Sequence, residues 1–520
     1  MRRTFLPSTV MLMAALSTLA STANAQSGST NLGGAAGSVL NAPVETFSDA
    51  GAVYDSAPVY SEAPVYSYQQ GAPQSYQPAA QPTAAAAPKK PEPTPYKGVY
   101  YANDFSYLTD SYEGPRYIGD NWKNLDVGQN GKLSIGGELR YRYHSENGQG
   151  RQASAVGTAF QETENDFGLL RLRLFADYKA TDRLRFYVEG IYSDVIHSND
   201  EFIPRGPIDR NFGDITNLFA DVKISDSTTV RIGRQELLLG SQRLVSPLDW
   251  ANTRRTFQGV RTISKFDKYD IDAFWTQPVP VLAGEFDRGT EQTDFFGTYL
   301  TYKGLKNSKL DLYYLGLDTE DVLSVDTFGT RLHGGKDAWL WDVEAAIQTG
   351  TQQALGQSIE AYAVTAGIGR KFDRPWKPTL WFYYDYASGD ESGTGNTFEQ
   401  FNELFPLGHK YLGFIDAVAR ANVAAPNVQL TLQPTKKLKL IAWWHNFQAA
   451  QIDSPIPGVA TSAAQNTDSR DLGNELDLVA NLNVNPRTNI FLGYSHFFRG
   501  DRVIGTRDAD FFYLQLTKRF

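Results

Sequence analysis

The chain contains no cysteine among its 520 residues. This absence excludes disulfides, thiol chemistry, thiolate metal sites and a lipoprotein anchor, which needs a cysteine after the signal. A chain that crosses an oxidising periplasm gains from having no thiols to mispair. The six histidines are scattered without the spacing of a metal site, and no phosphate-binding loop or serine nucleophile elbow occurs. We therefore expect no enzyme, no cofactor and no bound metal.

Long apolar runs are also missing. Outside the N-terminus no stretch of about 18 apolar residues occurs, so no transmembrane helix is expected. The apolar content is 41% and the mean hydropathy is −0.38. A transmembrane β-barrel remains compatible with these values, because its lipid-facing residues occupy only alternate positions.

The first 25 residues have the three parts of a cleaved export signal. Arg2 and Arg3 form the basic end, an apolar core follows, and an A-x-A cleavage site spans 23–25. Cleavage removes two positive charges and no acid, so the net charge changes from −9 to −11. Anion binding must then come from a local arrangement of charges, and binding to nucleic acid is not expected.

The remaining chain divides by composition. Residues 26–97 are rich in Ala, Pro, Ser, Tyr and Gln and bury too little apolar surface to fold. We predict a disordered periplasmic tether there, and keep a segment that binds cell wall or a partner as the alternative. A lead-in spans 98–131, and a barrel spans 132–520.

Alternating segments of about ten residues continue from Lys132 to the last residue, bounded by turn residues. They predict an all-β fold, a transmembrane antiparallel barrel of eighteen strands. The predicted strands are 132–146, 167–179, 183–197, 214–225, 228–236, 256–266, 269–276, 293–303, 309–317, 325–333, 338–349, 359–372, 379–388, 418–433, 437–449, 473–485, 488–499 and 510–520.

The connections between these strands alternate in length. Short turns such as "ATD" near 181 and "NPR" near 486 alternate with mostly long loops such as 198–213 and 237–255. This alternation is typical of outer-membrane barrels, with short turns in the periplasm. It argues against a secreted β-rich enzyme or adhesin. The final strand ends on Phe520 and would close the barrel, which removes an unpaired edge.

Four arginines occupy every second position of the hairpin "RLRLFADYKATDRLRFYVEG", at Arg171, Arg173, Arg183 and Arg185. Side chains alternate across a strand, so the leucines between them form the other face. An arginine facing lipid near the midplane costs about 2–4 kcal/mol. Four such costs approach the whole stability of a typical domain, about 5–15 kcal/mol. We therefore predict that these arginines point into the lumen.

Two interpretations of the inward arginines remain open. In the first they are structural: Arg171 or Arg173 pairs with Glu189, and Asp177 pairs with Arg183 or Arg185. In the second they exceed their local acids and line the path of an anionic chain, whose carboxylates the planar guanidinium binds bidentately. The predicted path residues are Arg140, Arg142, Arg171, Arg173, Arg183, Arg185, Arg231, Arg261 and Arg331.

The stretches "VRIGRQELLLGSQRLVSPLDWANTRRTFQGVR" and "FNELFPLGHKYLGFID" resemble the alginate export family of outer-membrane proteins. The resemblance covers roughly 117–520 and implies an 18-stranded barrel that passes a uronic-acid polysaccharide passively. The motif residues that it adds are Arg234, Gln235, Glu236, Arg243, Asp249, Arg254, Arg255, His409 and Asp416. We expect the loop 237–255 to fold into the pore or over its mouth. Arg234 and Glu236 break the inward alternation, which a bulge or the rim would explain.

The function that we predict is an outer-membrane channel for an anionic, alginate-like polysaccharide in a Gram-negative-type bacterium. The alternative is a general or small-solute porin on the same barrel. Expected partners are the polysaccharide, outer-membrane lipid and lipopolysaccharide, and the barrel-assembly machinery, which would bind the C-terminal strand ending at Phe520.

Overall fold

The computed structural model describes residues 96–520 except 110, 153–158, 392–394, 455, 457–465 and 467. The predicted signal peptide, and the predicted tether up to residue 95, lie outside the described residues. Within the described part no helix has the length and apolar character needed to cross a membrane.

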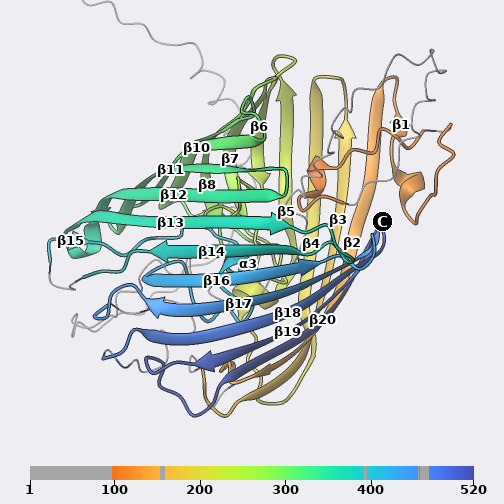
Figure 1. Ribbon diagram of the computed structural model, residues 1–520. Helices are drawn as coiled ribbons and strands as arrows, with labels where there is room; N and C mark the ends of the chain where they lie inside the picture. Colours follow the sequence, from red (N-terminus) through yellow and green to blue (C-terminus); the bar gives the residue numbers. More distant parts are fainter. Residues whose placement is uncertain are drawn as a thin grey trace, which may run out of the picture. The chain divides into compact units, whose positions relative to one another are not determined.

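The described chain forms a closed antiparallel barrel of eighteen strands, β2–β14 and β16–β20, joined in sequence order (Figure 1). The last strand pairs with the first from Glu138↔Arg519 to Asn147↔Asp510, which closes the ring. The predicted fold class and number of barrel strands are therefore confirmed. Two further strands are short: β1 pairs with the start of β2 in antiparallel register, and β15 pairs with β13 in parallel.

The barrel strands are β2 Gly131–Asn147, β3 Glu164–Lys179, β4 Leu184–Ser198, β5 Asn211–Lys223, β6 Thr228–Gln235, β7 Thr256–Lys265, β8 Tyr269–Val279, β9 Thr293–Tyr302, β10 Ser308–Thr319, β11 Leu323–Lys336, β12 Trp339–Gln352, β13 Gln357–Lys371, β14 Thr379–Ala387, β16 Val423–Leu432, β17 Leu438–Ala449, β18 Asp471–Asn485, β19 Thr488–Arg499 and β20 Ala509–Arg519. The short elements are η1 Tyr100–Ala102, η2 Asp120–Trp122, β1 Leu125–Val127, α2 Gly206–Asp209, η4 Gln353–Leu355, β15 Thr397–Phe398 and α3 Gly408–Tyr411.

The two faces of the wall differ as the alternation predicts. On β13, Ala361 and Ala363 are buried, whereas Tyr362 between them and Ile368 further along are exposed. An exposed apolar stripe of this kind suits lipid, because it requires no polar partner. The inward positions contact chain inside the barrel.

The apolar core lies within the barrel, where segments from its long-loop end fold inward. Residues 236–255 and 399–422 supply buried side chains that pack against the inner faces of β8–β20. The predicted strand 418–433 therefore begins too early, because β16 starts only at Val423. The residues before it are buried in the second inserted segment rather than paired in the wall.

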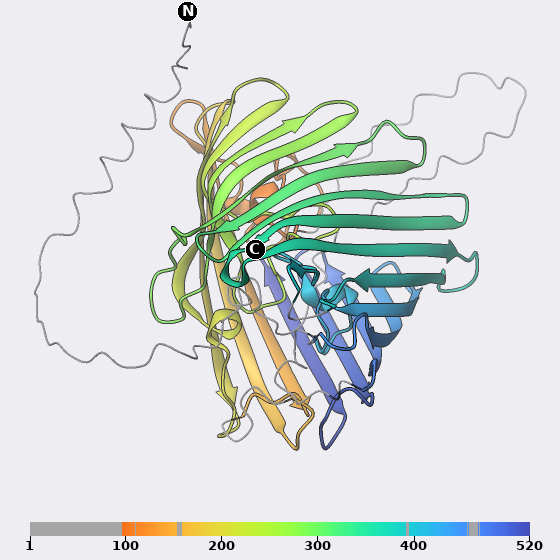
Figure 2. The same cartoon turned by 90° about the vertical axis from the view of Figure 1, so that its left-hand side faces the viewer.

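The lead-in packs at the short-turn end of the barrel, near the C-terminus (Figures 1 and 2). Its apolar side chains form one cluster with inward aromatic residues of β3, β4 and β5. The predicted tether boundary at residue 97 is wrong by at least two positions, because Tyr96 is buried in this cluster. The cluster consists of Tyr96, Val99, Tyr100, Tyr101, Phe105, Leu108, Phe175, Tyr187 and Phe219.

Candidate functional site in the barrel interior

Two pairs of arginines lie directly opposite each other on neighbouring strands. The register places Arg140 on β2 opposite Arg171 on β3, and Arg231 on β6 opposite Arg261 on β7. Like charges in this arrangement are destabilising unless other groups offset them. The groups that surround each pair therefore decide what the interior can bind.

The first pair is offset by the loop 237–255, which enters the barrel between β6 and β7. Arg140 donates to the carbonyl oxygens of Asp249 and Ala251, both at 2.8 Å. Arg142 donates to the Trp250 carbonyl at 2.8 Å, and its guanidinium carbon lies 3.2 Å from the centre of the Trp250 ring. The prediction that this loop folds into the pore is confirmed.

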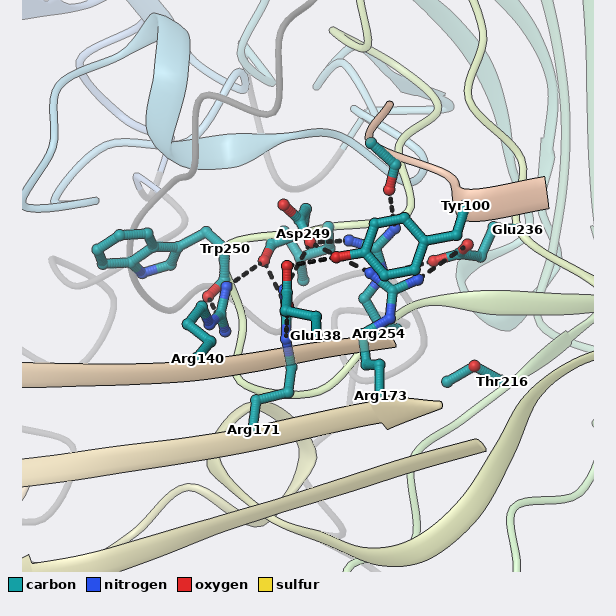
Figure 3. A network of polar contacts seen from close by, with 12 residues as sticks. Tyr100, Glu138, Arg140, Arg171, Arg173, Thr216, Glu236, Asp249, Trp250 and Arg254 are labelled. Atoms are coloured by element: carbon teal, nitrogen blue, oxygen red, sulfur yellow. Dashed lines mark hydrogen bonds and ion pairs between the residues drawn. The ribbon is translucent and has the colours of Figure 1, made fainter. Parts of the chain in front are cut away.

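The carboxylate of Asp249 joins the loop to the wall (Figure 3). It accepts from Arg171 at 2.9 Å and from Arg254, and Arg171 also pairs with Glu138 on β2 at 2.7 Å. Burial favours the neutral form of Asp249, but the guanidiniums of Arg254 and Arg171 outweigh burial and hold its pKa below the ordinary value. Asp249 is therefore a charged anchor of the loop.

Arg173 completes the cluster beside Arg171. Its Nε donates to Glu189 at 2.6 Å, which confirms one of the cross-hairpin pairs predicted from the sequence. Arg254 pairs with Glu236, the residue directly after β6. In Figure 3 the side chains of Arg171, Arg173, Glu236, Asp249 and Arg254 point toward one another and form one network.

Arg140 and Arg142 differ from the other arginines of this network. Both are buried, with exposed fractions of 1%. Across the described residues, no carboxylate oxygen lies within 4.0 Å of either guanidinium, and their bonds go to backbone carbonyls and one amide oxygen, that of Asn252. Buried charges are usually paired, because desolvation is costly. The interior of this conformation thus holds two guanidiniums that only neutral acceptors satisfy.

The second inserted segment, 399–422, supports the first. Phe405 exchanges backbone hydrogen bonds with Leu244 and Ser246, at 2.9 and 2.8 Å. His409 stacks on Trp250 with ring centres 5.2 Å apart, and its Nδ1 contacts Asp416 at 2.7 Å. The two motifs that the sequence singled out therefore meet inside the barrel.

The inserted segments also bond to the wall opposite the arginine pair. Arg243 donates to Glu344 at 2.7 Å and to Asp342 at 2.9 Å, both on β12. Glu475 on β18 accepts the backbone N–H of Ile415 at 2.8 Å. This approach depends on Gly413, whose φ is +87° and where a Cβ would meet the Glu475 carboxylate at 2.3 Å.

The lead-in reaches the same network from the short-turn end. The Tyr100 hydroxyl donates to Glu138, and its ring lies 4.1 Å from the Arg173 guanidinium. Tyr101 donates to the Glu236 carbonyl at 2.6 Å, and Arg254 donates to the Gly98 carbonyl at 3.0 Å. The arginine network therefore lies between two packed segments, the lead-in and the inserted loop.

With this geometry established, the comparison with known families is direct. The family model described as Alginate export matches residues 131–514, which is most of the chain and the whole ring from β2 into β20. The chain belongs to the alginate export family.

Solved structures from Pseudomonas aeruginosa share the barrel. OpdG is 14% identical with a TM-score of 0.55, covering 75% of this alginate export family chain and 98% of that chain. The outer membrane protein OpdK is 13% identical with a TM-score of 0.53, covering 74% and 98%, and OprD is 14% identical with a TM-score of 0.50, covering 75% and 94%. No curated protein sequence matches the chain. Family and fold together make this alginate export family member an outer-membrane channel protein.

Four of the other predicted path residues have acid partners. Arg185 pairs with Asp177, as predicted, Arg231 with Asp221, Arg261 with Asp272 and Arg331 with Asp342, each with a closest contact of 2.6–2.7 Å. Arg183 lies instead in the exposed turn between β3 and β4, so the strand predicted from 183 begins at Leu184. Because Arg183 lies in the turn and not in a strand, the alternation of side chains between the inner and outer faces does not place it in the lumen as predicted.

The residues that broke the alternation are explained by the rim of the barrel. Arg234 lies opposite Leu218, whose side chain is exposed on the outer face, and it donates to Asp214 at 3.2 Å and to the Asp287 carbonyl at 2.8 Å. Gln235, the last residue of β6, is buried, and the chain then turns inward at Glu236. Arg255 donates to the Pro406 carbonyl at 3.0 Å and thus holds the two inserted segments together.

Sequence reasoning missed two features of the interior. It assigned no contact to the lead-in, although "YYANDFSYL" is dense in aromatic residues of the kind that packs. It also did not predict that 399–422 fills the barrel, although that stretch carried a family motif. Within the described residues, no group of three or more His, Asp or Glu side chains could hold a metal ion.

Proposed function

We propose that this channel lets an anionic, uronic-acid polysaccharide cross the outer membrane by passive diffusion. The proposal depends on one observation: the guanidiniums of Arg140 and Arg142 are buried and donate their hydrogen bonds to neutral oxygens. Family membership supports it, because the family is described by alginate export.

The loop 237–255 occupies the position that a polyanion would take. Its carbonyl oxygens at Asp249, Trp250 and Ala251 accept from the arginines of β2 and β3. A uronate carboxylate brings a full negative charge to these donors and can engage a guanidinium at two points, whereas a backbone carbonyl brings only a dipole. Uronate groups therefore compete with the loop for these donors, and binding to them favours withdrawal of the loop.

The proposed partners follow from the surfaces of the barrel. The apolar outer face suits membrane lipid and lipopolysaccharide. The C-terminal strand β20 closes onto β2, where the Phe520 carbonyl accepts the Gly137 N–H at 2.9 Å, and we propose this strand as the contact for barrel-assembly machinery. The chain carries a net charge of −9, so nucleic acid is not among the proposed partners.

The test compares charged and neutral oligosaccharides of equal length. Refolded protein in a planar bilayer is exposed to oligogalacturonate and then to malto-oligosaccharide, and the ionic current is recorded. The proposal predicts block by the uronate at concentrations that leave the maltose polymer without effect. Equal block by both, with passage of small solutes, would favour the small-solute porin instead.

A further inference from the structure

Cations gather in one recess at the short-turn end of β3, β4 and β5. Five of them line a volume of about 390 Å³, and we call this recess the basic cup. Short turns of outer-membrane barrels face the periplasm, so the cup lies at the entrance for an exported molecule. Its cations are Lys132, Lys179, Arg183, Arg185 and Lys223.

The strand register concentrates these charges. Lys179 on β3 lies directly opposite Lys132 on β2 and also directly opposite Arg185 on β4. Three cations thus occupy one row across three neighbouring strands. Like charges placed directly opposite are destabilising, so the row lowers the stability of the wall unless an anion offsets it.

The acids nearby offset the row only in part. Lys132 contacts Asp126 at 2.5 Å and Lys223 contacts Asp226 at 3.2 Å, and the carboxylates of both pairs are highly exposed. Exposed ion pairs contribute little to stability and are readily displaced. Asp182 and Asp221 also line the cup, but over the described part of the chain no carboxylate oxygen lies within 4.0 Å of Lys179 or Arg183.

The cup is continuous with the arginine network in the interior. Arg185 contacts Asp177 at 2.6 Å and Asp221 at 3.4 Å, and Asp221 also accepts from Arg231 at 2.7 Å. Arg185 in addition donates to the Tyr101 carbonyl of the lead-in at 2.7 Å. A carboxylated chain that binds the cup is therefore adjacent to the segment that covers the interior arginines.

We propose that the basic cup is the periplasmic capture site, where carboxylates of the exported uronic-acid chain first bind before entering the barrel. This inference rests on the proposed function and adds a place and a direction to it. The occupant is the polymer rather than a lipid headgroup, because Lys179 lies two residues from Asp177 on β3 and therefore on the inner face of the wall. The neighbours Tyr178 and Phe186 belong to the outer face.

The test measures how fast oligogalacturonate blocks the channel when it is added to each side of a zwitterionic planar bilayer in turn. The double variant Lys179→Gln/Arg183→Gln is compared with wild type and with Lys306→Gln/Lys436→Gln. The latter removes two exposed cations from other short turns. Electrostatic capture raises association rates by about 10-fold or more, so we expect the first variant to lose roughly three- to ten-fold in association rate. The loss should occur from one side only, and the control variant should keep the wild-type association rate.

The outcomes separate this inference from the proposed function. Absence of uronate block in the wild type, from either side, overturns the proposed function and the capture site together. Block of the wild type with an equal association rate in Lys179→Gln/Arg183→Gln overturns the capture site alone, as does an equal loss in the control variant. If anionic lipid changes the conductance of wild type and not of the variant while oligomer association is unaffected, the cup binds lipid and the inference is wrong.

Discussion

Asp249→Asn tests whether the inserted loop is held in the barrel by charge. The carboxylate accepts from Arg171 at 2.9 Å and from Arg254. Hydrogen bonds to charged groups contribute about 1.5–3 kcal/mol each, and a neutral acceptor retains roughly half. The variant should therefore weaken docking of the loop by about 1.5–3 kcal/mol, which is on the order of a 10- to 150-fold rise in the undocked population.

The chain has no cysteine, so a single introduced thiol reports on the loop. Ala251 is small and 2% exposed, and Ala251→Cys places the thiol in the part of the loop that contacts Arg140 and Arg171. Maleimide labelling of this thiol should accelerate about 10- to 150-fold when Asp249→Asn is added. Asp287→Asn is the matched control, because burial raises the pKa of this loop carboxyl to about 6 and loss of its charge costs little. An unchanged labelling rate in Asp249→Asn, or an equal change in the control, would refute the reasoning.

Three further predictions follow from the same contacts. Arg142→Ala should leave the barrel folded, as judged by heat-modifiable migration, because no carboxylate among the described residues loses its partner. Arg173→Ala leaves Glu189 buried and should destabilise the fold by about 3–5 kcal/mol, so equal effects of the two variants would contradict the assigned pairs. A mature chain that begins at Arg116 lacks the tyrosines that cover the arginine network and should show a larger unit conductance; the conductance of the full chain would contradict this role of the lead-in. The pKa of Asp249 is lower in the folded protein than its ordinary value of about 3.9. Its contribution to loop docking is therefore complete above about pH 3.9 and is lost as the pH falls below that value. Channel opening that begins already between pH 7 and pH 5 would contradict this expectation.

The wall of the barrel was predictable because lipid imposes a period of two on every strand. A buried arginine stripe facing lipid would have been too costly, so the direction of Arg171 and Arg173 followed from the sequence alone. The hairpin also predicted that Arg171 or Arg173 pairs with Glu189, and Arg173, 16 residues away along the chain, is the one that does. Contacts of this kind depend on alternation and a tight turn, and both are visible in a single sequence.

The interior was less predictable because its contacts join distant segments. Arg140 and the Asp249 carbonyl are 109 residues apart, and Arg254 and the Gly98 carbonyl are 156 apart. Side chains in such loops do not alternate between two faces, so their direction cannot be predicted from the sequence. The acceptors are backbone carbonyls, which every residue carries, so residue type does not identify them either. The sequence could therefore indicate that 237–255 enters the pore, but not that it would satisfy the arginines of β2 and β3.

The measurement that tests the central claim most directly is the reversal potential of the refolded wild-type channel in a planar bilayer under a potassium chloride gradient. Arg140 and Arg142, which no carboxylate oxygen of the described residues approaches within 4.0 Å, predict a reversal potential of the sign that marks preference for chloride. The double variant Arg140→Gln/Arg142→Gln should shift this potential toward zero. Preference for potassium, unchanged in the double variant, would mean that the acids of the interior dominate the path and would contradict an anion channel.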